Sequence, residues 1–208
     1  MTSDPAYEAV SKAKRQVEGG NPDGAVGTLE TYLATDPHNT RPRLELARIY
    51  IYGLDDEKSG MFQLDIILDL EPDNIEALKA AVTVLGKHKK HNRETSEKFE
   101  RLLELDQSAE VCNMYARFLR RQMTDFKKAG EYYEKAIAKD PNNVDYHQNY
   151  AVLLLNDLKD YEKAKIQLEL LMKMKPGDLN IRKNYDRLMK DKFDKNGNLK
   201  KKRFGFGR

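Results

Sequence analysis

The sequence KDPNNVDY, residues 139–146, holds two Asp, two Asn and a Pro within six positions. Carboxylate and amide oxygens are the ligands that Ca²⁺ and Mg²⁺ prefer, so this stretch is the first candidate for a metal site. The stretch KPGDLN, residues 175–180, places a proline 35 residues after Pro141 but surrounds it with different polar residues. Because the proline is kept and the polar residues change, we expect both stretches to be corners between helices rather than metal sites.

The four histidines offer little for catalysis or metal binding. His88 and His91 are three residues apart, but their neighbours in KHKKHNR are mostly cations and supply no third ligand. We expect this stretch to be a solvated basic turn. His38 and His147 are expected near turns between helices.

DKNGN, residues 194–198, is similar to the opening of a calcium-binding EF-hand loop. That loop needs Gly at its sixth position and Glu at its twelfth, where this chain has Leu199 and Gly205. We therefore interpret Asn196-Gly197 as a turn. The sequence also lacks a glycine-rich phosphate loop, a nucleophile elbow and an HExxH pattern. We expect no catalytic residue, no bound metal and no cofactor, so the chain is not predicted to be an enzyme.

The composition is typical of a folded helical protein. Of 208 residues, 39% are hydrophobic and 34% charged, which is too apolar for a disordered chain. No window approaches 18 uninterrupted apolar residues, so no membrane span is expected, and the N-terminus has no signal-like region. The single cysteine, Cys112, cannot form an internal disulfide and fits a packing position, which favours a cytoplasmic location.

An internal period organises the whole chain. Pro37 and Pro72 are 35 residues apart, as are Pro141 and Pro176, and LDQ at 105–107 stands where an intervening proline would fall. Apolar residues recur within each unit at spacings of three and four, the helical period. We predict five helix pairs and a capping helix, with helix starts at Pro5 and at the N-caps Thr124, Asn143 and Asp178. The predicted pairs span about 5–37, 39–72, 74–107, 109–141 and 144–176, and the capping helix spans 178–191.

Two of these units resemble tetratricopeptide (TPR) repeats. DFKKAGEYYEKAIAKDPNN and DYEKAKIQLELLMKMKPGD are similar to the second helix of that repeat. Ala116, Ala129, Tyr133, Ala136 and Pro141 match the expected small, aromatic and proline positions. The earlier units match less closely, and MYARFLRRQ faintly resembles the half-a-TPR family of RNA-processing scaffolds instead, although the alanine-rich second helices favour TPR.

The resemblance implies an all-α fold, a right-handed α-solenoid of TPR repeats. Residues 1–192 would form the solenoid and residues 193–208 a basic flexible tail. No single helix pair can bury its own apolar face, so the pairs are expected to stack and to leave a concave groove.

The groove implied by this resemblance would be lined by the first helix of each pair. Amide side chains there can pair with the backbone of an extended peptide, and arginine can bind carboxylates with two hydrogen bonds. We therefore predict a non-enzymatic scaffold that binds a peptide or helix, acidic in character. A chaperone carboxylate clamp is not predicted, because only Asn149 matches that pattern. The predicted groove residues are Arg48, Lys79, Asn113, Arg117, Arg121, Asn149, Asn184 and Arg187.

The C-terminal sequence NGNLKKKRFGFGR is the second candidate for binding. Residues 195–208 hold six cations and no acid. Lysines that neutralise phosphate and phenylalanines that stack on bases suit nucleic acid, which suggests an RNA- or ribosome-associated adaptor as the alternative function. The same residues also suit an acidic protein surface, or docking of Phe204 and Phe206 into a neighbouring subunit, so a homo-oligomer stays open. The tail residues concerned are Lys200, Lys201, Lys202, Arg203, Phe204 and Phe206.

Overall fold

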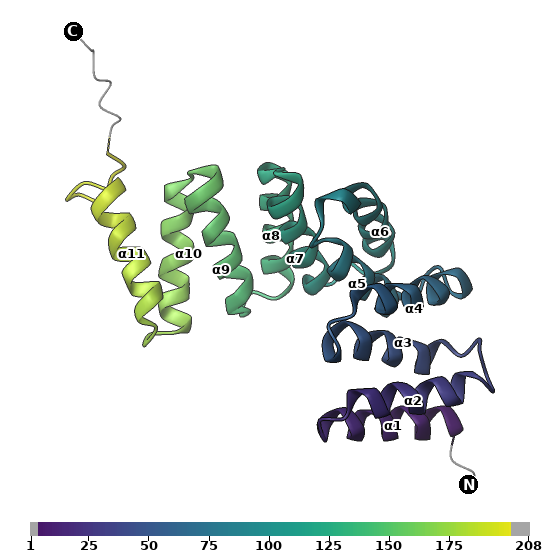
Figure 1. The fold of residues 1–208 in the computed structure, drawn as a ribbon. Coiled ribbons are helices and arrows are strands. Elements are labelled where there is room, and N and C mark those ends of the chain that lie inside the picture. Colours follow the sequence, from purple (N-terminus) through teal and green to yellow (C-terminus); the bar gives the residue numbers. More distant parts are fainter. Residues whose placement is uncertain (1–3, 201–208) are drawn as a thin grey trace. The chain divides into compact units, whose positions relative to one another are not determined.

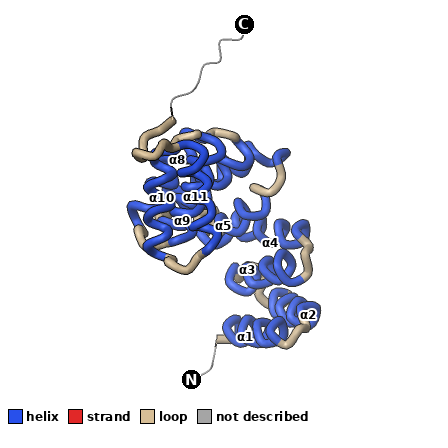
Figure 2. The backbone as a smooth tube through the Cα atoms, turned by 90° about the vertical axis from the view of Figure 1, so that its left-hand side faces the viewer, coloured by secondary structure: helices blue, strands red, loops and turns tan. Residues whose placement is uncertain are grey.

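The computed structural model describes residues 4–200, all of whose regular structure is helical (Figures 1 and 2). The chain divides into two compact units, Met1–Gln107 (the N-terminal unit) and Ser108–Arg208 (the C-terminal unit). The N-terminal unit contains α1 (Pro5–Glu18), α2 (Pro22–Leu33), α3 (Thr40–Arg48), α4 (Glu57–Leu70), α5 (Ile75–Leu85), the 3₁₀ turn η2 (Lys89–His91) and α6 (Asn92–Leu105). The C-terminal unit contains α7 (Ala109–Phe118), α8 (Phe126–Lys139), α9 (Val144–Leu153), α10 (Tyr161–Met174) and α11 (Leu179–Lys192). Within residues 4–200, no helix combines the length and the apolarity needed to cross a membrane.

Successive helices pack against one another within each unit, because each buries one apolar stripe. α8 buries Ala129, Tyr133 and Ala136, which recur at spacings of four and three and therefore share one face. Ala116 of α7 is fully buried. Small residues of this kind let neighbouring helices approach closely, so the alanines singled out by the repeat pattern lie where two helices meet.

Three of the first helices end in the same unusual corner. α3, α7 and α9 each run into a five-residue π-helical turn: η1 (Ile49–Gly53), η3 (Leu119–Met123) and η4 (Leu154–Leu158). A residue in the left-handed conformation follows each turn or comes within two residues of it: Asp55, Thr124 and Lys159, with φ of 53°, 54° and 56°. An aspartate comes next, Asp56, Asp125 or Asp160, and its side chain accepts a hydrogen bond from a backbone N–H of the second helix.

This corner corrects one of the predicted helix starts. Thr124 is not the N-cap of α8; its φ of 54° takes the chain out of the π turn, and Asp125 caps the helix instead. The predicted caps Asn143 and Asp178 are confirmed, since their side chains accept hydrogen bonds from Asp145 N and from Asn180 N and Ile181 N. Pro5 occupies the first turn of α1 as predicted.

The chain turns back on itself after α11. Phe193 is buried and forms an isolated antiparallel bridge with Leu199. The Asp194 side chain accepts hydrogen bonds from Asn196 N and Asn198 N, both at 2.9 Å, and Gly197 has a φ of 80°. The turn predicted at Asn196-Gly197 is therefore present. Residues 201–208 of the expected tail lie outside the described residues.

Candidate functional site

The predicted groove residues of α7 and α9 meet at one amide–amide hydrogen bond. Asn149 Nδ2 donates to Asn113 Oδ1 at 3.1 Å, although the two residues are 36 positions apart in sequence. Asn113 is only 8% exposed, so its side chain is held against the helix pair. Arg117 follows Asn113 by four residues and Arg121 by eight, which places the three on one side of α7 and its π turn. We call Asn113, Arg117, Arg121 and Asn149 the amide–arginine face.

The cations of this face lack acidic partners. Arg120, which lies next to the face, is neutralised by Asp157 at 2.5 Å. Arg117 and Arg121 are exposed and form no ion pair with any carboxylate among residues 4–200. Burial raises the pKa of Tyr133, while the charges of Arg120, Arg117 and Arg121 act to lower it. The result is a local excess of positive charge beside two amides.

The structure does not connect the α11 residues to this face by direct contact. Asn184 and Arg187 are exposed on α11, and Arg187 lies 3.8 Å from Asp191 on the same helix. Neither forms a hydrogen bond with Asn149 in the described part of the chain. Figure 1 shows α9, α10 and α11 as successive neighbours within the C-terminal unit.

Arg48 and Lys79 belong to the N-terminal unit, and both are already paired. Arg48 lies 2.6 Å from Glu76 on α5 and 4.0 Å from Glu45 on its own helix. Lys79 lies 3.1 Å from Asp106. An acidic ligand would have to displace these carboxylates, so these two cations are less suited to bind one than Arg117 and Arg121 are.

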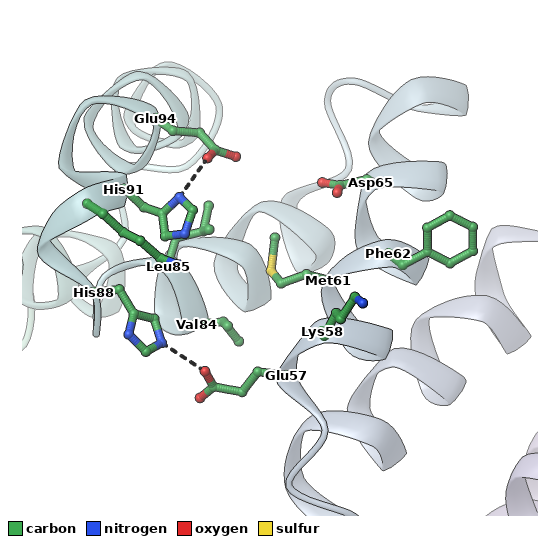
Figure 3. A pocket seen from close by; sticks show the side chains of 11 residues that line it. Glu57, Lys58, Met61, Phe62, Asp65, Val84, Leu85, His88, His91 and Glu94 are labelled. Atoms are coloured by element: carbon green, nitrogen blue, oxygen red, sulfur yellow. Dashed lines mark hydrogen bonds and ion pairs between the residues drawn. The ribbon is translucent and has the colours of Figure 1, made fainter.

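A pocket in the N-terminal unit was not anticipated from the sequence. It lies between α4, α5, η2 and α6, has a volume of about 440 Å³, and has Met61, Phe62, Val84 and Leu85 as its apolar lining (Figure 3). We call it the Phe62 pocket, because Phe62 is 62% exposed on α4 at its rim. The sequence does contain a signal for this pocket, because Phe62 is an apolar residue at a helix position where the repeat pattern has a polar one.

Each of the two histidines at this pocket is paired with a glutamate. His88 Nε2 lies 2.9 Å from Glu57 Oε2, and His91 Nδ1 lies 3.4 Å from Glu94 Oε2. Hydrogen bonds from Lys87 and His88 lower the pKa of Glu57. Over residues 4–200, no group of three or more His, Cys, Asp and Glu side chains is placed to hold a metal ion. KHKKHNR contains the 3₁₀ turn η2, and residues 87–90 are exposed.

The tail residues can be placed only in part. Lys200 donates from its backbone to Lys192 O at 2.8 Å and from Nζ to Lys190 O at 2.5 Å. It therefore closes the C-terminal end of α11, where unpaired carbonyl groups favour a cation. Lys201, Lys202, Arg203, Phe204 and Phe206 lie outside the described residues.

Known proteins resemble this chain in sequence locally and in fold more widely. Two family models described as "Tetratricopeptide repeat" match residues 109–143 and 132–166. No curated protein is found to match the sequence. The solved structure of MamA, residues 41 to the end, from Desulfovibrio magneticus RS-1 has a TM-score of 0.74 at 18% identity and covers 86% of this chain and 99% of its own.

Two further solved structures have the same fold. A tetratricopeptide repeat protein from Parabacteroides merdae has a TM-score of 0.75 at 15% identity, with 90% of this chain and 73% of that chain covered. YrrB, described as a TPR protein with an unusual peptide-binding site, has a TM-score of 0.65 at 16% identity, with 78% and 82% covered. At these identities the likeness shows the fold alone. Residues 109–166 thus match tetratricopeptide-repeat models, and the described part of the chain has the all-helical fold of TPR solenoids.

Proposed function

We propose that this chain is a non-enzymatic, cytoplasmic interaction scaffold that binds an extended acidic peptide on the amide–arginine face. The observation that carries the proposal is the Asn149–Asn113 hydrogen bond beside two exposed arginines that lack a carboxylate partner among residues 4–200. Proteins of the TPR family generally act as interaction scaffolds. That YrrB is described as having a peptide-binding site supports a peptide as the kind of ligand this fold can take.

The chemistry of the face suits two features of such a peptide. The hydrogen bond between Asn113 and Asn149 uses one donor and one acceptor, and each amide has a further polar group that can pair with a peptide backbone. Arg117 and Arg121 can each bind a carboxylate with two parallel hydrogen bonds. Asn184 and Arg187, exposed on α11, would extend the contact along the C-terminal unit.

The second function suggested by the sequence, an RNA- or ribosome-associated adaptor, rests on Lys200 to Phe206. Of these residues only Lys200 is described, and its ammonium group donates to Lys190 O. No described contact favours RNA as its ligand, and we therefore propose the peptide-binding function alone.

A selection experiment tests the proposal without a known partner. The full chain is immobilised and a random ten-residue peptide library is selected on it, and the best binders are then measured by fluorescence anisotropy. We expect Asp and Glu to be enriched in the selected peptides. The triple variant Arg117→Ala, Arg121→Ala, Asn149→Ala should bind them at least tenfold more weakly, because two charge-assisted contacts and one amide contact are lost.

The matched control removes two cations from α8 in the same unit. Lys127→Ala with Lys139→Ala changes the net charge equally but leaves the amide–arginine face intact, so it should alter affinity by less than about twofold. Circular dichroism of both variants checks that the unit stays folded. Peptides without acidic enrichment, or equal binding by the triple variant, would show that this face is not the binding site.

A further inference from the structure

One residue beside the amide–arginine face differs in kind from its counterparts on other helices. Val152 of α9 is apolar, and 38% of it is exposed. It is the ninth residue of its helix, and its neighbours on either side, Ala151 and Leu153, are buried. Val152 is therefore the position at which α9 offers an apolar contact. The ninth residues of α3, α5, α7 and α11 are all polar: Arg48, Thr83, Arg117 and Arg187.

The two bonded asparagines fix where Val152 lies. Asn149 precedes Val152 by three residues, and Asn113 precedes Arg117 by four, so each pair shares one side of its helix. Because Asn149 donates to Asn113 at 3.1 Å, the turns that follow these asparagines are neighbours as well. An exposed apolar side chain and a cation are thus presented next to each other on one surface of the C-terminal unit.

The packing that holds α9 recurs at α11. The Tyr150 hydroxyl of α9 donates to Glu134 on α8. The Tyr185 hydroxyl of α11 donates to Glu169 on α10 at 3.1 Å, and both of these residues lie 35 positions after their counterparts. Because α11 packs on α10 as α9 packs on α8, its ninth residue, Arg187, continues the same row. Along that row, α7, α9 and α11 present arginine, valine and arginine.

The two arginines of this row differ in how they are neutralised. Arg117 has no carboxylate partner among residues 4–200. Arg187 lies 3.8 Å from Asp191, one turn later on its own helix, and its side chain is 83% exposed. This pair is longer than the 2.6 Å pair of Arg48 and Glu76, and exposed pairs of this kind contribute little. A ligand carboxylate can therefore bind at Arg117 and, more weakly, at Arg187.

The distance between helices converts this row into a spacing along a peptide. Packed helices lie about 8–10 Å apart, and an extended chain advances about 3.3 Å per residue. A peptide that crosses from one first helix to the next therefore advances by about three residues. The side chain that contacts Val152 is then about three residues from the one that reaches Arg117, and about three residues, on its other side, from the one that reaches Arg187.

We propose that the amide–arginine face selects a peptide in which an apolar residue, packed on Val152, has an acidic residue about three positions before it and another about three positions after it. This inference rests on the proposed function, because it names the sequence that the same face binds. Val152 determines specificity for the central residue, and Arg117 and Arg187 bind the flanking carboxylates. The pattern is the same for either direction of the peptide, because an acid stands on both sides.

The ten-residue library selected on the full chain gives the first test, since a seven-residue pattern fits within it. We expect the selected peptides to carry Leu, Ile, Val, Met or Phe at the third position from an acid, and acids on both sides of it. Selection on the Val152→Thr variant should keep the acids and lose the apolar residue. Threonine has nearly the shape of valine and already occupies the ninth position of α5, so the variant is expected to fold.

A double-mutant cycle gives the second test. One selected peptide and its derivative with alanine at the apolar position are titrated by fluorescence anisotropy. Val152→Thr should weaken binding of the first peptide about fivefold and of the alanine derivative by less than about twofold, because the lost contact is already absent there. The matched control is Ile166→Thr on α10, which removes another exposed apolar group of the unit and should leave both affinities within about twofold.

The outcomes for this pattern and for the face itself are distinguishable. Selected peptides without an excess of acids would overturn the proposed function and the pattern together. Acids may be enriched, and the triple variant of Arg117, Arg121 and Asn149 may lose binding, without any apolar preference at the third position. That result, or an equal effect of Val152→Thr on both peptides, would leave the proposed function standing and show that Val152 does not select the central residue.

Discussion

Position 60 requires glycine because neighbouring atoms leave no room for a side chain, and not because of its backbone conformation. A Cβ built on Gly60 would lie 2.9 Å from Ile51 Cδ1 and 3.1 Å from the carbonyl oxygen of Ala47, and closer still to Ile51 Cγ1. Both neighbours belong to the buried cluster of the N-terminal unit, and the Ala47 oxygen is a backbone atom. The first turn of α4 can approach the end of α3 only because residue 60 has no side chain.

Gly60→Ala should therefore destabilise the protein although alanine is the better helix former. Helix propensity would contribute at most about 1 kcal/mol in favour of alanine, whereas overpacking costs roughly 1–3 kcal/mol. We expect a net loss of up to about 2 kcal/mol in the free energy of unfolding, measured by urea denaturation. The control is Gly27→Ala on α2, which has open space around its Cβ position and should gain about 0.5–1 kcal/mol. Equal effects of the two substitutions would contradict the packing argument.

Arg43 and His147 occupy equivalent positions in two repeats, and the structure shows that they have the same two kinds of hydrogen-bond partner. Arg43 donates to Pro37 O at 2.5 Å and to Gln63 Oε1 at 2.6 Å. His147 lies 2.9 Å from Pro141 O and 2.7 Å from Gln167 Oε1, at the same two sequence separations. Both are buried, and burial lowers the pKa of Arg43.

The sequence predicts that His147 lies near a turn, but it does not predict this role shared with Arg43. The equivalent positions of the third and fourth repeats hold Leu78 and Cys112, so no residue type marks the site. The signal in the sequence is a combination of three positions. In both repeats, a proline stands six residues before the polar side chain and a glutamine twenty residues after it. A search along one helix for amphipathic spacing cannot detect such a pattern.

At the scale of helices, the all-helical fold could be predicted because the period appears in both apolar spacing and proline placement. The corners between first and second helices could not be predicted in this way. Each needs a residue with positive φ, and this chain uses Asp55, Thr124 and Lys159 there instead of glycine. Because the positive-φ position has no common residue type, the sequence carries no signal for the π turns. The prediction of Thr124 as the N-cap of α8 is wrong for this reason, since Asp125 is the cap.

Hydrogen bonds from tyrosine to glutamate connect first helices to the second helix of the preceding pair. The Tyr50 hydroxyl donates to Glu30 at 2.9 Å and that of Tyr185 to Glu169 at 3.1 Å, and Tyr150 donates to Glu134. Burial, with the bond to Glu30, raises the pKa of Tyr50 to about 12. These bonds tie neighbouring pairs together at positions where the side chains are only partly covered.

Tyr50→Phe should lower the free energy of unfolding by about 0.5–1.5 kcal/mol at pH 7, because one hydrogen bond to a charged acceptor is lost from a partly exposed position. The folded-state pKa lies above the usual value of 10, so this contribution is complete below pH 10 and is lost as the pH rises toward 12. Urea unfolding at pH 7, 10 and 11 measures it. The difference between wild type and Tyr50→Phe should shrink at pH 11, whereas a difference that is constant with pH would indicate lost packing alone.

At the scale of the whole molecule, the predicted groove residues lie in two compact units, and the cations of the two units differ in whether a carboxylate neutralises them. Arg48 and Lys79 in the N-terminal unit are paired with carboxylates, whereas Arg117 and Arg121 in the C-terminal unit are not. The sequence could place all of them on first helices, since helical periodicity decides which side chains share a face. It could not tell paired from unpaired cations, because Glu76 and Asp106 come from helices or turns well separated in sequence from the cations they neutralise.

The division predicts that binding of acidic peptides depends on one unit only. Arg48→Ala with Lys79→Ala should change the affinity for a selected acidic peptide by less than about twofold, because cations that are already neutralised by a carboxylate contribute little to a further ligand. Arg117→Ala with Arg121→Ala removes the same charge and should weaken binding about tenfold.

Isothermal titration calorimetry of the two full-length double variants against one peptide, at two salt concentrations, measures this difference. The affinity of the Arg48, Lys79 variant should keep the salt dependence of the wild type, while that of the Arg117, Arg121 variant should lose most of it, because the screened charges are then absent. Equal losses in both variants would mean that the ligand displaces Glu76 and Asp106 from their arginine and lysine partners. In that case the unpaired state of Arg117 and Arg121 would not be what selects the binding surface.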